Sequence, residues 1–370
     1  MKIRERLEAF WAGERPDVIP FTIYQWEWRH TEHDPAWQSL FDKGMGVTWH
    51  LATTAERWGD DIELREETIQ EHGKALRRRS IGTPVGEVFE LFEDDWRQKF
   101  YLETAQDYAV MTYVAKQIQV EPAYEEYEAK VAELPPYCVP LSLTGRTPNQ
   151  TVLVDLVGLE NYAFHLFDLE KEMMELYTAL LANYRRRAEL VAGGPGRFVS
   201  VLENFTAETL GPKRYKQLLS PVYDECFPWL QQAGKIVGTH YDGQLSAVKD
   251  LVAAAPMDLI ESVTPPPEGD MTLADCRAAW PDKLLWSNLN VGCYELPPQE
   301  LKDEVLSRVA EASPDGRGQV TGVSRRRQKA DCLVPSTRGK WWGGSTSRLA
   351  RLWRTVLQLR HRPWRCVSKF

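Results

Sequence analysis

Short apolar runs alternate with stretches of helical periodicity through the second half of the chain. Runs of four to eight residues rich in β-branched side chains predict buried strands, and apolar positions three and four apart predict helices. Strands are predicted at 198–204, 235–241, 257–262, 283–290 and 318–324, and helices between them at 212–233, 244–255, 272–280 and 297–312. This alternation is typical of βαβ units around a parallel sheet.

The first half of the chain predicts a helix, two strands and a hairpin excursion. Ile3, Leu7 and Phe10 have helical spacing, which predicts a helix over 2–12. Apolar runs predict strands at 18–24 and 137–145, and an aromatic-rich stretch around 49–58 predicts a helix. Alternation over 62–92, with turn signals at His72-Gly73 and Thr83-Pro84, predicts a β-hairpin excursion.

These elements predict an α/β fold, a (β/α)8 TIM barrel with an N-terminal helix and a β-hairpin excursion, over residues 1–324. Counting 18–24 and one strand of the hairpin region gives about eight strands, the number that a closed barrel needs. A doubly wound open sheet is the alternative, but no G-x-G-x-x-G turn supports it.

Polar residues follow four consecutive predicted strands. In a barrel the active site lies at the carboxyl ends of the strands, so these residues are candidates for chemistry. They are Glu203 and Asn204, His240 and Asp242, Glu261, and Asn288 with Asn290. His240 and Asp242 lie two apart on extended chain, so their side chains face the same way and can bind zinc. Glu261 is a candidate third ligand or general base, and Glu203, Asn204 and Asn288 are candidates for substrate binding.

Each candidate also has a structural interpretation. Asp242 can form an Asx-turn with Gly243, which leaves His240 as a histidine at the barrel rim. Glu261 can be a buried carboxylate paired with an arginine, and Glu203-Asn204 can cap the next helix. Trp26 and Arg29, which follow the first strand, can hold a flat or anionic ligand or close the barrel mouth.

Composition and charge narrow the class of protein. No apolar run approaches the ~20 residues of a membrane span. The N-terminus is amphipathic rather than signal-like, and six scattered cysteines form no CxxC pair. We therefore expect a cytoplasmic protein without a membrane partner. Residues 325–370 hold ten Arg, three Lys and one Asp, a net charge of +12, so the rest of the chain carries −20 of the total of −8. An acidic barrel argues against nucleic acid as its partner.

The basic segment 325–370 differs from the rest of the chain in composition as well as in charge. Arg, Ser, Gly, Trp, Cys and Pro dominate it, a composition that out-of-frame translation of a GC-rich gene can produce. The hypothesis is a frameshift near codon 325, or a disordered tail. The alternative is a basic arm for an acidic partner, with an amphipathic helix over 348–360.

Several segments resemble the uroporphyrinogen decarboxylase superfamily over about residues 2–323. They are RERLEAFWAGERPDVIP, GTPVGEVFE, LENFTAETLGPKRY, PVYDECFPWLQQAGKIVGTHYDG and ESVTPPPEGDMTLADCRAAWPDKLLWSNLN. The resemblance implies a (β/α)8 barrel. It also implies one of two activities: tetrapyrrole decarboxylation, or zinc-dependent methyl transfer from a corrinoid protein to a thiol or another acceptor.

Two motifs separate these branches. The decarboxylases carry an arginine-rich loop after the first strand, where this chain has YQWEWRH with the single Arg29, which argues against a polyanionic tetrapyrrole. They also carry a histidine near the end of the last strand, and GQVTGVS has none. The methyltransferases carry His-x-Cys-Gly, where this chain has His240-Tyr-Asp242-Gly. Zinc accepts oxygen ligands, so His240, Asp242 and Glu261 can still bind it, as a harder Lewis acid.

The sequence therefore predicts a metal-dependent methyltransferase that acts on a small-molecule substrate, with zinc as cofactor and a corrinoid presented by a partner protein. One alternative is a decarboxylase that acts on a different carboxylated substrate. The other is a non-catalytic binding protein that keeps the fold, which is consistent with the missing cysteine and arginine signatures.

Overall fold

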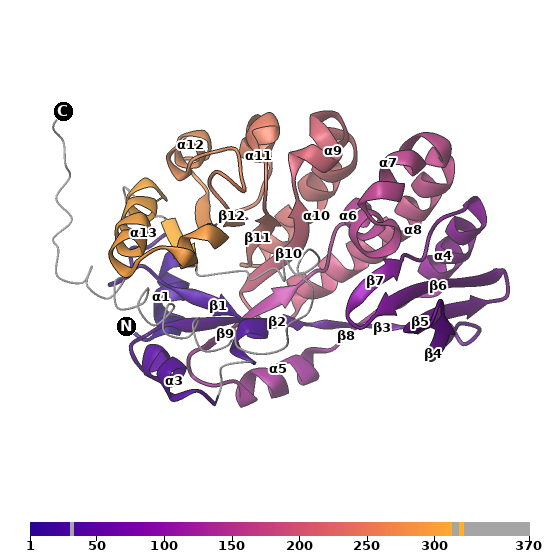
Figure 1. Cartoon of the computed structure of the whole chain (residues 1–370), viewed down its shortest axis with the longest axis horizontal. Helices are drawn as coiled ribbons and strands as arrows, with labels where there is room; N and C mark the ends of the chain where they lie inside the picture. Colours follow the sequence, from indigo (N-terminus) through magenta and orange to yellow (C-terminus); the bar gives the residue numbers. More distant parts are fainter. Residues whose placement is uncertain (30–32, 313–317, 322–370) are drawn as a thin grey trace. The chain divides into compact units, whose positions relative to one another are not determined.

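Eight parallel strands follow one another in a single sheet in chain order, the arrangement of an α/β fold of TIM-barrel type (Figure 1). The computed structural model describes residues 1–29, 33–312 and 318–321. The strands are β1 (Thr22–Tyr24), β2 (Gly46–Ala52), β9 (Cys138–Leu143), β10 (Phe198–Phe205), β11 (Ile236–Tyr241), β12 (Leu259–Val263), β13 (Leu284–Asn288) and β14 (Gly318–Thr321). Within the described residues β1 and β14 are the two ends of this order and are not paired with each other.

The chain divides into two compact units, which are described separately. Of the described residues, unit 1 comprises those within 1–50, 131–141 and 238–321, and unit 2 comprises 51–130 and 142–237. In unit 1 the helices are α1 (Ile3–Trp11), α2 (Gln25–Trp28), α3 (Pro35–Asp42), η3 (Ser246–Val248), α11 (Lys249–Ala254), α12 (Leu273–Ala279), η4 (Val291–Glu295) and α13 (Pro298–Ala312). Helix α5 (Tyr124–Glu133) begins in unit 2 and ends in unit 1.

The core of unit 1 packs strands against amphipathic helices. Helix α13 buries Leu301, Val305 and Val309, which are spaced four apart and therefore lie on one face. They join one apolar cluster with Phe21 of the chain before β1 and Val47 of β2. Helix α1 buries its apolar positions as its spacing predicts, and its Ile3, Leu7 and Phe10 are at most 4% exposed.

Unit 2 carries two antiparallel sheets beside its share of the parallel strands. One pairs β3 (Thr54–Arg57) with β8 (Gln119–Pro122), and the other contains β4 (Glu63–Glu71), β5 (Lys74–Thr83), β6 (Gly86–Glu93) and β7 (Trp96–Lys99). The remaining helices are α4 (Ala105–Gln117), α6 (Pro148–Gln150), η1 (Thr151–Val157), α7 (Leu159–Asp168), α8 (Glu170–Gly193), α9 (Ala207–Arg214), η2 (Tyr215–Leu219) and α10 (Ser220–Gln232). The predicted hairpin excursion is confirmed, and His72 and Gly73 form its first turn with positive φ.

Two details of the predicted strand count are wrong. The stretch 49–58, predicted as a helix, forms the end of β2 and all of β3, and no hairpin strand belongs to the parallel sheet. Residues 47–51 (VTWHL) do alternate apolar and polar side chains, which is the period-2 signal of a strand, but the prediction followed the aromatic-rich composition of 49–58 instead. The total of eight is kept because β2 takes the place of the hairpin strand.

Among the described residues, no helix combines the length and the apolarity that a membrane crossing requires. The basic segment 325–370 lies outside the described residues, so the frameshift hypothesis and the basic-arm alternative both stay predictions.

A buried arginine ties α1 to the chain that leads into β1. Arg6 is 3% exposed, and its guanidinium donates to both carboxylate oxygens of Asp17, at 2.6 and 3.2 Å. These hydrogen bonds hold the pKa of Asp17 at about 2 against the opposing effect of burial. The pair fixes the entry of the first strand.

We predict that Asp17→Asn destabilises the protein near neutral pH by roughly 1 kcal/mol, a value reduced for solvent screening because the Asp17 side chain is 40% exposed. A carboxyl with a lowered folded-state pKa adds stability above its unfolded pKa and loses it as pH falls through the folded value. The deficit of the variant should therefore shrink between about pH 4 and pH 2. Urea unfolding across this range measures it, with Glu14→Gln as control, and a deficit independent of pH would contradict the prediction.

Candidate functional site

The carboxyl ends of β11 and β12 bring His240 and Glu261 together in unit 1. The two residues are partners in the parallel register of these strands. Nδ1 of His240 lies 3.8 Å from Oε1 of Glu261, an ion-pair distance that exceeds hydrogen-bond length. Glu261 is 1% exposed. The sequence placed both residues after consecutive strands, and the register makes them neighbours.

Tyr24, at the end of β1, is the second partner of Glu261. Its hydroxyl donates a hydrogen bond of 2.8 Å to Oε1 of Glu261, and its ring is 1% exposed. Burial and the charge of Glu261 raise the pKa of Tyr24 well above its usual value, so the phenol stays protonated and remains a donor.

Glu261 keeps its negative charge although it is buried. Burial on its own raises the pKa of this carboxyl, but the interaction with His240, the proximity of His50 and the hydrogen bond from Tyr24 outweigh it. The net result is a pKa below the ordinary glutamate value. A buried anionic carboxylate beside a histidine stabilises the protonated imidazolium form of that histidine.

Aromatic rings line the same cluster. Trp26 of α2 stacks on Tyr24, with ring centroids 4.4 Å apart and planes 13° apart. His50 of β2 lies 5.9 Å from both Tyr24 and Trp26, with its ring nearly parallel to each. Trp26 is 38% exposed, so it offers an accessible edge next to buried polar groups. We name Tyr24, Trp26, His50, His240 and Glu261 the His240 cluster.

Sequence reasoning missed two members of this cluster. His50 lies in the stretch that was predicted as a helix, so it was not considered among the residues at strand ends. Tyr24 ended the predicted first strand but was not among the candidate site residues. The available signal was the polar residue that closes the run VTWH at the end of β2.

Three other predicted residues of unit 1 occupy different surroundings. Asp242 is half-buried, and its charge helps to raise the pKa of Tyr24. Arg29 is exposed, with its guanidinium carbon 5.8 Å from the centroid of the Trp49 ring. Asn288 donates to the Ser262 hydroxyl at 2.5 Å.

Asn288 supports the irregularity in strand β12 that follows Glu261. Ser262 has a φ of 72°, and the register of β12 against β13 shifts between Glu261 and Val263. A non-glycine residue in this region persists only where its surroundings hold it. The observed contact makes Asn288 a residue that positions Glu261, and its predicted contact with substrate stays a prediction.

The predicted zinc ligands do not form a metal-binding set in this arrangement. Within the described part of the chain, no group of three His, Cys, Asp or Glu side chains is placed to hold a metal ion. Oxygen Oε1 of Glu261 already meets Tyr24 and the ring of His240. The donor set therefore does not fit tetrahedral zinc, and zinc and a corrinoid stay predictions from the resemblance.

Glu203 and Asn204 belong to unit 2, at the end of β10. Glu203 is fully buried and accepts hydrogen bonds from the hydroxyls of Thr147 at 3.0 Å and Tyr223 at 3.1 Å. Burial raises the pKa of Glu203 to about 7, and the two hydroxyls only partly oppose this. Asn204 has a positive φ of 49°. These hydrogen bonds do not test whether Glu203 and Asn204 bind substrate, which stays a prediction.

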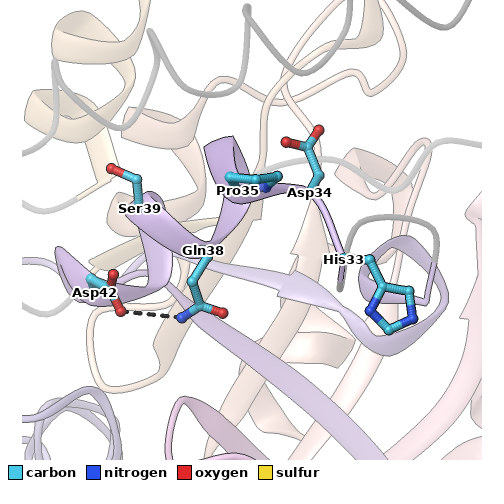
Figure 2. Close-up of a pocket in the computed structure, with 6 residues that line it drawn as sticks. All are labelled: His33, Asp34, Pro35, Gln38, Ser39 and Asp42. Atoms are coloured by element: carbon cyan, nitrogen blue, oxygen red, sulfur yellow. Dashed lines mark hydrogen bonds between the residues drawn. The ribbon is translucent and has the colours of Figure 1, made fainter.

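A surface hollow of about 390 Å³ lies on α3. Figure 2 shows its lining residues, which are His33, Asp34, Pro35, Gln38, Ser39 and Asp42. Asp34 caps the helix by accepting from the Ala36 amide, and Gln38 donates to Asp42 one turn later. These contacts stabilise the helix itself and supply no buried acid–base pair.

Comparisons with known proteins give no family. No protein-family model matches the chain, and no curated protein matches it. Among solved structures, it is similar to a putative vitamin-B12-independent methionine synthase from Listeria monocytogenes, with 13% identity over 65% of this chain and 69% of the other and a TM-score of 0.38. It is also similar to the pneumococcal virulence factor StrH, with 11% identity over 93% of this chain and 83% of the other and a TM-score of 0.36. At these TM-scores neither likeness carries an argument about function.

We predict that Glu203→Gln removes a pH-dependent loss of stability in unit 2. A raised carboxyl pKa means that the folded wild type binds its proton more tightly, so its stability declines as pH rises from the unfolded value, about 4.3, through the folded value of about 7. The variant should gain roughly 1 to 3 kcal/mol relative to wild type between pH 4 and pH 8.

Chemical unfolding at both pH values measures this difference. Glu208→Gln, on the exposed part of α9, is the matched control and should show no such gain. A stability difference between Glu203→Gln and wild type that stays constant with pH would contradict the prediction.

Proposed function

We propose that the chain is an enzyme of the uroporphyrinogen decarboxylase type in which His240 transfers a proton to or from a bound substrate. The observation that carries the proposal is the surroundings of Glu261, a buried anion in contact with both His240 and Tyr24. An anionic carboxylate orients a histidine and stabilises its imidazolium, so the ring can act as a general acid or base. Proton transfer by a positioned side chain typically contributes 10²- to 10⁴-fold to rate.

The reaction that this arrangement supports best is decarboxylation of a small carboxylated substrate. As the carbon–carbon bond to the carboxylate breaks, its electron pair stays on the substrate carbon. The His240 imidazolium supplies the proton that converts this carbanion to a C–H bond, and Glu261 stabilises the charged ring before transfer. This reaction requires no metal ion, so it does not depend on a third side chain that would bind one beside His240 and Glu261.

The exposed edge of Trp26 supports a flat substrate in this position. Its indole is stacked on Tyr24 and therefore held in one orientation. Aromatic rings provide apolar contact area with little loss of conformational freedom. The single Arg29 suits one carboxylate group rather than the several of a tetrapyrrole.

Methyl transfer from a corrinoid protein is the second candidate. The observation in its favour is that two of the three residues expected to bind zinc, His240 and Glu261, come within 3.8 Å of each other. Zinc would supply Lewis-acid chemistry toward a methyl acceptor, but the donor set does not fit it as the side chains stand, so methyl transfer ranks below decarboxylation. The third candidate is a non-catalytic binding protein with the same fold.

We predict that purified wild type contains less than about a tenth of an equivalent of zinc and releases CO2 from a member of a panel of small aromatic and heteroaromatic carboxylates. His240→Ala should slow this release by about 10²-fold or more, because it removes the proton donor. Glu261→Gln should slow it less, since the ring remains. Elemental analysis and CO2 trapping measure both quantities, with His72→Ala in the exposed hairpin turn as control.

The other outcomes separate the candidates. About one equivalent of zinc that is lost in both His240→Ala and Asp242→Ala would contradict decarboxylation and favour methyl transfer. Folded protein without zinc that releases no CO2 across the panel would contradict both enzymatic proposals and favour a binding protein.

A further inference from the structure

His50 is a buried histidine whose two ring nitrogens make no hydrogen bond among the described residues. It is 8% exposed at the end of β2, and neither Nδ1 nor Nε2 has a hydrogen-bond partner among the described residues. Buried polar side-chain atoms are hydrogen-bonded in the large majority of cases. Two unsatisfied nitrogens on one ring therefore point to a group that binds there.

The ring of His50 is held in place by contacts that leave its nitrogens unused. Its backbone amide donates to Oε1 of Gln25 at 2.5 Å, which fixes the chain. Its ring plane lies 6° from that of Trp26 and 17° from that of Tyr24, at 5.9 Å from each. Aromatic neighbours in parallel planes restrict rotation of the ring, so its nitrogens keep a constant direction.

The charges around His50 decide what it can bind. The groups that act on it are Glu261, which favours the imidazolium, and His240, which opposes it. Burial is the largest effect and lowers the pKa of His50, so the ring is neutral near pH 7. A neutral imidazole has one nitrogen that donates and one that accepts. Its matching ligand group also donates and accepts, as a lactam, an amide or a pyrrole-type ring with a carbonyl does.

We propose that His50 is a ligand-binding residue of the His240 cluster that recognises a planar, neutral ligand group carrying both a hydrogen-bond donor and an acceptor, with Trp26 as the neighbouring flat contact. This inference rests on the proposed function, because that function makes the His240 cluster a substrate-binding site. The test measures binding without turnover, so the ligand-binding role of His50 and the proposed enzymatic activity can fail separately.

The probes are 2-pyridone, a planar lactam that donates and accepts, and N-methyl-2-pyridone, which lacks the donor. We expect wild type to bind 2-pyridone at least tenfold more tightly than its N-methyl analogue. His50→Phe keeps the ring shape and removes both nitrogens, so it should lose this preference. His50→Gln supplies an amide donor and acceptor and should retain part of it. NMR titration measures the affinities, and His72→Phe is the matched control.

Equal binding of the two probes by wild type, binding of neither, or a preference that survives in His50→Phe would overturn the proposal. A preference lost in His240→Ala but kept in His50→Phe would assign recognition to His240 instead.

A second measurement covers the case in which His50→Phe does not fold. In wild type labelled with ¹⁵N-histidine, the ring nitrogen signals of His50 should shift when 2-pyridone is added and remain unchanged with N-methyl-2-pyridone. Unchanged His50 signals with both probes would overturn the proposal.

Discussion

A negative charge held inside unit 1 is the constraint on which the candidate site depends. An isolated carboxylate in a protein interior is very costly unless it is paired and hydrogen-bonded. Glu261 meets this requirement through Tyr24 and His240, which lie on different strands. Glu261 in turn raises the pKa of Tyr24, so this phenol stays protonated and remains a donor. The proposed acid–base chemistry follows from this one contact set.

Two buried carboxylates at strand ends show how neighbours decide the chemistry of the same residue type. Glu203 of unit 2 accepts hydrogen bonds from neutral donors, the Thr147 and Tyr223 hydroxyls among them, so burial prevails and raises its pKa to about 7. Glu261 of unit 1 faces two histidines and a phenol, and its pKa is lowered. Burial, nearby charge and hydrogen bonding act on both, and their balance differs. Position at a strand end therefore indicates a candidate, and the partners determine its protonation state.

The sequence predicted the parallel α/β architecture because short apolar strands and amphipathic helices leave distinct local periods. It also placed His240 and Glu261 at the ends of consecutive strands, and the observed register makes the two residues partners. It could not supply the bond between Tyr24 and Glu261, which joins residues 237 positions apart. It missed His50 because the aromatic-rich stretch 49–58 was predicted as a helix, although VTWHL at 47–51 alternates apolar and polar residues as a strand does. The zinc set stays a prediction for a related reason: residue types at strand ends do not reveal which oxygens already have hydrogen-bond partners.

The charge state of Glu261 is the quantity that tests this account most directly. Carbon-13 NMR of labelled glutamate side chains, assigned with Glu261→Gln, gives the pKa of that carboxyl in the folded protein. The account predicts a value clearly below the ordinary glutamate pKa of about 4.3, and a rise when His240 is replaced by alanine. A value at or above the ordinary one would mean that Glu261 is no stable anion, and it would contradict the proposed role of the His240 cluster.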